Sequence, residues 1–316
     1  MLLAAATTAS WFTGFSLPDV TLSFFAIILE GAPFLLLGAI ASGLVDLFLP
    51  PQLLRRFLPK SKAKGVLAAI AAGFFFPLCE CGAMPVISRL VRKGIPTSIA
   101  TTYLLATPLL NPLTLLSTWL AFRSQDPWLM VGLRLGFGTV VVFFIGIWLT
   151  QQRPEKMLRP EVLTGEAEGA ADALVNVNLR LGAPLPTLQR FCATVIRDFL
   201  GVLIFLVIGA GFAAVFSTGI NRAILDPIGQ STFFGPLAGI GLAQVLCLCS
   251  TTDAFIIATF ASFSVAAKIA FLVAGPLFDL KLFWLYQSLY QRKFVVTLWA
   301  LITGATLLLT VFYGFH

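Results

Sequence analysis

The chain has 316 residues, of which 58% are hydrophobic and only 11% are charged. Soluble globular domains carry about 25% charged residues, so this composition excludes a water-soluble globule. The formal net charge of +7 is no sign of nucleic-acid binding, because Lys and Arg in a membrane protein mark its cytoplasmic loops. The only His, His316, is the last residue, which leaves imidazole out of any internal metal site or proton relay.

Three segments of the first half are long enough to cross a bilayer, which takes about 20 apolar residues. They are residues 21–49, 95–122 and 128–149, and residues 1–18 are expected to form an extramembrane segment. Between the first two spans, two apolar pieces (66–78 and 83–91) are too short to cross, and both have basic flanks. This pattern predicts a re-entrant helical hairpin with Cys79-Glu80-Cys81-Gly82 at its tip.

Residues of rare type recur at a spacing of 168 positions (247 minus 79). Apolar matches arise by chance in so hydrophobic a chain, whereas rare types seldom do, so the pattern predicts an internal duplication. Repeat 1 covers residues 19–150 and repeat 2 covers residues 191–316, and the polar segment 151–190 is expected to be an exposed cytoplasmic linker. The matched pairs are Cys79 and Cys247, Cys81 and Cys249, Pro108 and Pro276, Asn111 and Asp279, and Glu30 and Asp198.

Three crossings in one half give the next half the opposite orientation. The basic stretch 55–64 is expected in the cytoplasm, whereas the second hairpin (233–246 and 251–265) has few basic flanks and is expected to enter from outside. We therefore expect an all-α polytopic protein with two inverted repeats, six full spans and two re-entrant hairpins. Both chain termini would lie on the non-cytoplasmic side, and the two hairpin tips would meet near the membrane midplane.

Four of the five cysteines form two Cys-x-Cys pairs at the predicted tips, and Cys192 is interpreted as a small apolar side chain. The pairs could likewise be apolar packing, or they could form disulfides, although Cys-x-Cys closes a strained ring. Thiolates also select soft ions such as Cu(I) and Zn²⁺. We favour Cys79, Cys81, Cys247 and Cys249 as ligands of one thiophilic substrate, with no cofactor required.

Carboxylates within apolar segments are costly and therefore suggest function. Glu80, between two thiols, is a substrate ligand and a candidate proton carrier, or it pairs with Arg89. Glu30 is the second proton-coupling candidate, and its match Asp198 is expected nearer the interface. Asp253 occupies the position that matches Pro85 and is expected to bring a carboxylate close to the second tip.

Prolines interrupt the apolar segment that follows the predicted hairpin in each half. Pro108 and Pro276 remove backbone donors inside a helix, and a polar residue follows each one three positions later. We expect these residues, Asn111 and Asp279, to line a cavity, and a simple proline kink is the alternative. Lys281 is either the partner of Asp279 or extends its ammonium towards the interface.

The stretches PLCECGAMP (77–85) and ATPLLNP (106–112) resemble the signature of the ArsP/YraQ-like predicted permeases of bacteria. The signature reads Pro-x-Cys-x-Cys-Gly-x-x-Pro and then Ala-Thr-Pro-x-x-Asn-Pro, which adds Thr107 to the candidate site. The resemblance implies a multi-pass permease of the bacterial inner membrane, with relatives linked to export of trivalent organoarsenicals or soft metals. Glu80 stands where relatives commonly have a small polar residue, and an acid there favours a cation over a neutral organoarsenical.

We therefore expect a secondary transporter that exports a thiophilic ion or metalloid, and not an enzyme. The chain has no GxxxxGK[ST] motif, so ATP drive would need a partner protein. The alternatives are a permease for an unrelated small solute, with structural cysteines, and a membrane thiol oxidoreductase. The expected partners are the lipid bilayer and a small inorganic or organometalloid substrate, with no nucleic acid, and the sequence allows a homo-oligomer.

Overall fold

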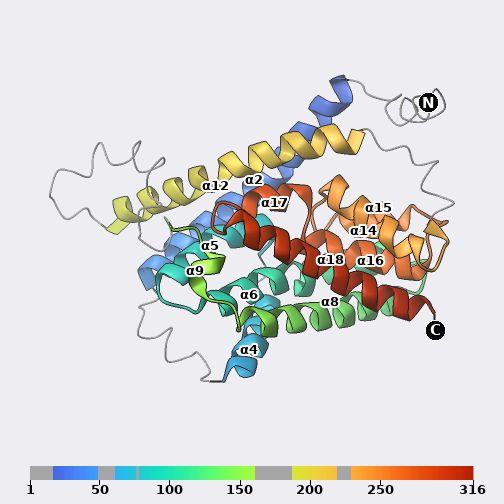
Figure 1. Cartoon of the computed structure of the whole chain (residues 1–316). Helices are drawn as coiled ribbons and strands as arrows, with labels where there is room; N and C mark the ends of the chain where they lie inside the picture. The colour runs from blue at the N-terminus through green and yellow to red at the C-terminus, as the bar shows by residue number, and fades with distance from the viewer. Residues whose placement is uncertain (1–16, 49–60, 76–77, 161–186, 219–228, 316) are drawn as a thin grey trace, which may run out of the picture.

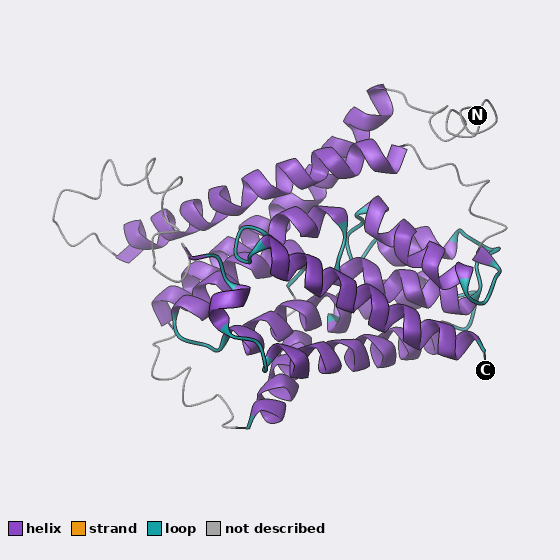
Figure 2. Ribbon diagram, viewed as in Figure 1, coloured by secondary structure: helices purple, strands orange, loops and turns teal. Residues whose placement is uncertain are grey.

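The computed structural model describes residues 17–48, 61–75, 78–160, 187–218 and 229–315. Within these ranges the regular elements are helices, as Figure 2 shows, so the all-α prediction is confirmed. The predicted extramembrane segment 1–18 and most of the linker lie outside the described residues.

Six helical segments are long and apolar enough to cross a membrane, as the sequence predicts. They are Leu17–Val45, Thr97–Ala121, Pro127–Leu149, Phe191–Val215, Val265–Tyr286 and Arg292–Gly314. The helices of the first half are α2 (Leu17–Phe48), α4 (Lys62–Phe75), α5 (Glu80–Arg92), α6 (Thr97–Leu110), α7 (Pro112–Ala121), α8 (Pro127–Leu149) and α9 (Pro154–Met157). Those of the second half are α12 (Thr187–Thr218), α14 (Phe234–Leu246), α15 (Asp253–Ala258), α16 (Val265–Leu277), α17 (Leu280–Tyr286) and α18 (Arg292–Gly314).

Two of the six spans are broken helices, and a polar side chain caps the second piece of each. The Asn111 side chain accepts a hydrogen bond of 2.9 Å from the Leu113 amide at the start of α7. The Asp279 carboxylate accepts one of 2.6 Å from the Leu282 amide at the start of α17. Capping satisfies amides that a helix start leaves without partners. The side chains at these breaks therefore stabilise the helix starts.

The two longest helices, α2 and α12, pack side by side and run in opposite directions (Figure 1). Gly43, near the end of α2, lies against Phe191 near the start of α12, and Gly31 lies against Leu206 further along. Close packing at small residues is typical of helices in membranes.

The helices α8 and α18 also run antiparallel. The ring of Trp148, at the end of α8, stacks on Phe294 at the start of α18 with centroids 6.3 Å apart. At the other end of the pair, Phe137 contacts Tyr313 at 5.7 Å. Antiparallel pairing of matched helices is what an inverted repeat requires, although the duplication itself stays a prediction.

We call α4 and α5 the first hairpin, and its two ends lie at one end of the bundle. The Lys62 ammonium donates to the Thr150 carbonyl just after α8, at 3.3 Å. The Lys93 ammonium, after α5, donates to the Val45 carbonyl near the end of α2, at 2.8 Å.

We call α14 and α15 the second hairpin, and both of its ends lie near the end of α18. Thr232, just before α14, lies beside Gly314. The Ser264 amide, after α15, donates to the Gly229 carbonyl at 3.1 Å. Each hairpin thus enters and leaves at one end of the bundle, and the position of the hairpins in a membrane stays a prediction.

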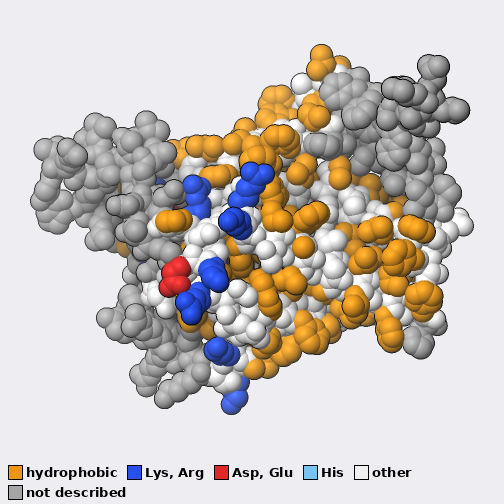
Figure 3. All heavy atoms as spheres, in the orientation of Figure 1, with side chains coloured by type: hydrophobic (Ala, Val, Ile, Leu, Met, Phe, Trp, Pro, Cys, Tyr) orange, Lys and Arg blue, Asp and Glu red, His pale blue; other side chains and the backbone are white. Residues whose placement is uncertain are grey.

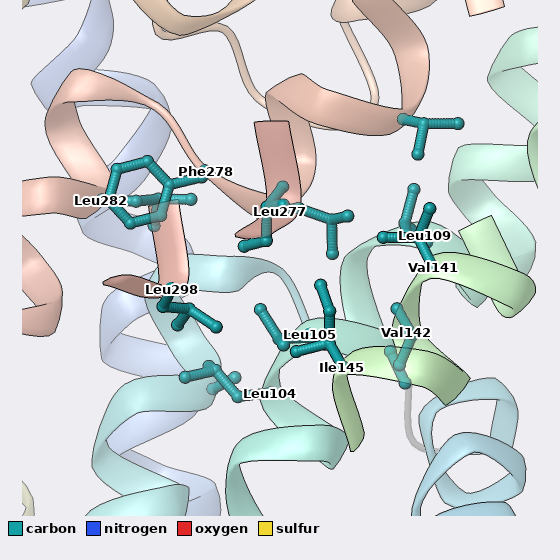
Figure 4. Close-up of a cluster of buried hydrophobic side chains, with 14 of the residues drawn as sticks. Leu104, Leu105, Leu109, Val141, Val142, Ile145, Leu277, Phe278, Leu282 and Leu298 are labelled. Carbon is teal, nitrogen blue, oxygen red and sulfur yellow. The ribbon is translucent and has the colours of Figure 1, made fainter. Parts of the chain in front are cut away.

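The buried core joins the two halves. Figure 4 shows apolar side chains of α6 and α8 facing those of α16, α17 and α18. The labelled residues are Leu104, Leu105, Leu109, Val141, Val142, Ile145, Leu277, Phe278, Leu282 and Leu298.

The start of the predicted linker is not exposed along its whole length, which corrects the expectation for residues 151–190. Met157 and Leu158 are apolar residues within this polar stretch, and both are buried. The Gln291 amide donates to the Met157 carbonyl at 2.9 Å, and its side chain donates to the Leu158 carbonyl at 2.8 Å. This part of the segment is therefore fixed to the start of α18.

Basic side chains gather at one end of the molecule, around α9 and the start of α18, whereas apolar side chains cover much of the remaining described surface (Figure 3). The exposed basic residues of this end are Lys62, Lys64, Arg153, Lys156, Arg292 and Lys293.

Candidate substrate site between the two hairpins

A pocket lies where the two hairpins meet the middle of α2. The first hairpin contributes Cys79, Glu80 and Cys81, and the end of the second hairpin's α14 leads into Cys247 and Cys249. The remaining lining residues are Ile27, Glu30, Gly31 and Phe34 of α2 and Lys281 of α17. The structure therefore brings all four motif cysteines to one pocket, two from each half.

We call Cys79, Cys81, Cys247 and Cys249 the pocket thiols, and local backbone geometry fixes several of them. The Cys79 sulfur caps α5 by accepting a hydrogen bond from the Gly82 amide at 3.3 Å. Cys247 ends α14 with a φ of 52°, in the left-handed region that non-glycine residues seldom adopt. The chain thus turns sharply at the second tip.

A close backbone contact seats the first hairpin on α2. A Cβ atom on Gly38 would overlap the Gly82 carbonyl group, and one on Gly82 would lie 2.7 Å from the Phe34 carbonyl oxygen. Only glycine at both positions allows the two backbones to approach so closely. This contact places the three residues before Gly82, which include two pocket thiols, against α2.

The pocket thiols face a shared space but do not form a closed coordination shell. All five cysteines are free. Among the described residues, no group of three or more Cys, His, Asp or Glu has the arrangement to hold a metal ion. Structural zinc sites, in contrast, have four closely placed ligands. The pocket therefore has sulfur donors of the type that soft ions prefer, without a preformed group of three or more metal ligands among the described residues.

Glu80 is 1% exposed and pairs across the two halves. It accepts hydrogen bonds from the Lys281 ammonium and from the Ser250 hydroxyl, each at 3.4 Å. The alternative that Glu80 pairs with Arg89 is wrong, because the Arg89 guanidinium binds Asp198 instead, at 3.1 Å.

Lys281 is 4% exposed and lies between two carboxylates. Its ammonium is 3.4 Å from Glu80 and 3.6 Å from Asp279. The alternative that Lys281 extends towards the interface is therefore wrong. Asp279 lies behind Lys281 and is not among the residues that line the pocket.

Glu30 lines the pocket from α2 and accepts a hydrogen bond of 3.3 Å from the Thr252 hydroxyl, just before α15. Its match Asp198 lies well inside α12 and accepts a hydrogen bond of 2.6 Å from the buried Ser42 hydroxyl. Arg89 and Ser42 both donate to its carboxylate within the protein, and its position relative to the membrane interface stays a prediction.

Asp253 is buried but does not line the pocket. It binds the guanidinium of Arg134 through two hydrogen bonds of 3.2 and 2.8 Å. Arg134 also donates to the Ser250 carbonyl at 3.2 Å and to the Thr118 hydroxyl at 2.7 Å. The carboxylate is therefore near the second tip, as the sequence suggested, but it belongs to an ion pair and not to the pocket.

The candidates Thr107 and Asn111 also lie outside the pocket lining. The Thr107 hydroxyl donates to the Tyr103 carbonyl one turn earlier in α6, at 2.7 Å. Asn111 is occupied as the cap of α7. Both side chains are buried and satisfy backbone groups within their own span.

The sequence did not predict that Lys281, Arg134 and Ser250 make the polar contacts between the two halves around the pocket. Two of these residues carried a signal. Arg134 is a basic residue inside an apolar span of 23 residues, and Lys281 follows the break between α16 and α17. Charges at such positions require a partner. Ser250 had no such signal, because serine is common in loops.

Comparisons with known proteins agree with a transporter architecture. The family model described as "Predicted permease" (ArsP_1) matches residues 17–315. UPF0718 protein YcgR of Bacillus subtilis is 35% identical over 87% of this chain and 90% of its own length. A "Putative two-component membrane permease complex subunit" of Streptococcus mutans is 32% identical over 86% of this chain and 87% of its own length. No solved structure matches the chain.

The match is almost as long as the chain and includes every residue of the pocket. UPF0718 protein YraQ of Escherichia coli is also similar, with 26% identity over 48% of this chain and 42% of its own length. The chain therefore belongs to the ArsP_1 family of predicted permeases, and it is a multi-pass membrane protein.

Proposed function

We propose that this permease is a secondary transporter that exports a thiophilic metal ion or trivalent metalloid through the pocket between its two hairpins. The observation that carries the proposal is the position of the four pocket thiols, two from each half, around one space. Thiol sulfur is the protein ligand that soft ions prefer. A site shared by two halves can lose half of its ligands when the halves move apart, which is what release of a substrate requires.

The incomplete coordination shell supports transport rather than storage. A transported ion must bind well enough to enter the site and weakly enough to leave it. The pocket thiols face one space without forming a group of metal-binding geometry in the described part of the chain. We infer that the substrate completes the site on binding and is released when the hairpins separate.

The proposed orientation in the membrane follows from charge. Exposed basic residues gather at the end where α8 ends and α18 begins, and such residues mark the cytoplasmic side. We therefore propose that α2 begins, and α18 ends, on the opposite side, with the first hairpin entering from the cytoplasm and the second from outside. Inverted halves and broken helices around a midplane site are typical of secondary transporters.

Transport by purified protein in lipid vesicles tests the proposal. Vesicles are loaded separately with Zn²⁺, buffered Cu(I) and a trivalent arsenical, and efflux is followed over time. We expect the wild type to transport at least one of these substrates, and the variant with all four pocket thiols changed to Ser to transport none. Cys192→Ser is the matched control, because Cys192 is exposed and lies outside the pocket.

Two results would overturn the thiol mechanism. One is a wild type that transports none of the three substrates although it is folded and correctly inserted. The other is a four-serine variant that transports as fast as Cys192→Ser, which would favour a permease for another small solute with structural cysteines.

A further inference from the structure

We propose that Lys281 is a tethered counter-cation: its ammonium occupies the place of a cationic substrate at Glu80 while the site is empty, and moves to Asp279 when the substrate binds. The inference rests on the proposed function and narrows its substrate class to a soft cation. It concerns three side chains that join the halves at the pocket, of which Glu80 and Lys281 face the pocket itself.

The ammonium is shared between two carboxylates and fully engaged by neither. Its distances are 3.4 Å to the Glu80 carboxylate and 3.6 Å to the Asp279 carboxylate. Hydrogen bonds between an ammonium and a carboxylate are shorter, about 2.7–2.9 Å. A movement of under about 1 Å towards either carboxylate would therefore complete the ion pair with that carboxylate.

Asp279 has an oxygen ready to receive the ammonium. Its Oδ1 atom is occupied by the Leu282 amide, at 2.6 Å. Its Oδ2 atom is buried, and its contact with the Lys281 ammonium, at 3.6 Å, is slightly longer than a hydrogen bond. A buried polar atom without a hydrogen bond is uncommon and calls for an explanation. A second position for the Lys281 ammonium supplies one.

The exchange gives Glu80 a cationic partner in both states. In the empty pocket the ammonium compensates Glu80, which would otherwise be a buried charge at high cost. When a soft cation binds the pocket thiols and Glu80, the ammonium is released to Asp279. Glu30, the third carboxyl group near this site, lines the pocket and accepts a hydrogen bond from the neutral Thr252 hydroxyl.

This arrangement predicts that the empty carrier can change orientation without a bound ion. A buried Glu80 carboxylate with no cation beside it would oppose that step. The Lys281 ammonium supplies this cation from within the protein. Removing the ammonium should therefore spare exchange of one substrate ion for another, which never passes through the empty state. It should impair net export, because net export requires the empty carrier to change orientation.

Binding and transport of Zn²⁺ in three variants test the inference. Lys281→Met removes the competing cation and should lower the Kd for Zn²⁺ at least about tenfold. The reason is that an ammonium and a bound metal cation repel each other strongly in a site of low polarity. Asp279→Asn retains a side chain that can cap α17 but removes the second acceptor, so it should raise the Kd. The double variant should bind like Lys281→Met alone, because Asp279 acts through Lys281.

The vesicle assay adds the readout that a merely structural role would not give. Lys281→Met should retain exchange of labelled Zn²⁺ for unlabelled Zn²⁺ and lose net efflux at least about tenfold. A neutral trivalent arsenical serves as the comparison, and its binding should be nearly the same in the wild type and in all three variants.

Different results would overturn the counter-cation role and the proposed function. The inference is overturned if Lys281→Met weakens Zn²⁺ binding, if exchange and net efflux fall together in folded protein, or if Asp279→Asn and the double variant bind alike. If the wild type binds the arsenical and not Zn²⁺ or Cu(I), the proposed function stands and the counter-cation role is rejected. If it binds none of them, both fail.

Discussion

The buried ion pair between Arg134 and Asp253 allows a stability prediction of definite size. Arg134 is 0% exposed, and its shorter bond to Asp253 measures 2.8 Å. Removing one member of a buried pair leaves the other charge without compensation, at a cost of about 3–5 kcal/mol. We expect Arg134→Met to lower the unfolding free energy by about this amount, and the midpoint temperature by on the order of 10 °C in a chain of this size.

The chain provides a matched comparison in a second Arg–Asp pair. Arg89 and Asp198 lie 3.1 Å apart, and their side chains are 11% and 15% exposed. Partial exposure screens the charges, so Arg89→Met should cost only about 1–2 kcal/mol. Thermal unfolding of both variants in the same detergent, followed by circular dichroism, measures the difference.

A double variant distinguishes two causes of instability: the lost attraction between the two charges, and the uncompensated charge that remains in the interior. Arg134→Met combined with Asp253→Leu removes both charges from the interior, and such replacements are often neutral or stabilising. We expect it to recover most of the stability that Arg134→Met loses. The reasoning fails if Arg134→Met is no more harmful than Arg89→Met, or if the double variant is as unstable as the sum of its two single variants.

Three further predictions concern backbone contact, capping and thiol access. Gly38→Ala would make a Cβ overlap the Gly82 carbonyl oxygen, so α2 and α5 must move apart and transport should fall, whereas Gly201→Ala, with no atom within 4 Å, should be neutral in the same assay. Asn111→Ala should cost about 1 kcal/mol in thermal unfolding through loss of the α7 cap, and Asn111→Ser, which keeps a neutral capping oxygen, should cost less. N-ethylmaleimide should modify Cys192 much faster than the four pocket thiols, as peptide mass spectrometry would show.

The sequence was sufficient for the spans and for the grouping of the cysteines. Spans follow from long apolar segments, which composition reveals directly. The common pocket followed from the repeat, because two matched Cys-x-Cys pairs at predicted hairpin tips suggested one place. The helix breaks near Asn111 and Asp279 could also be predicted, although their role as caps could not, since a cap depends on local backbone geometry.

The pairing of charges could not be predicted, because it joins residues far apart in the chain. Lys281 is 201 positions from Glu80, and Arg134 is 119 positions from Asp253. Local spacing favoured nearer partners, such as Arg89 for Glu80. In a membrane interior the choice among partners depends on which helices pack together. The apolar surfaces of the helices are too similar in composition to predict that packing.

The two Arg–Asp pairs have a common relation to the fold. Arg89 belongs to the first hairpin and binds Asp198 of the second half. Asp253 belongs to the second hairpin and binds Arg134 of the first half. Each hairpin is therefore attached to the opposite half by one Arg–Asp pair, and the pair of the second hairpin is the more deeply buried. The first hairpin has a second attachment in the ion pair between Glu80 and Lys281. If the hairpins move relative to the opposite half during transport, these bonds must either break or move with them, and breaking the buried pair would cost more. Of the two Arg–Asp pairs, we therefore expect the pair of the first hairpin to break more readily.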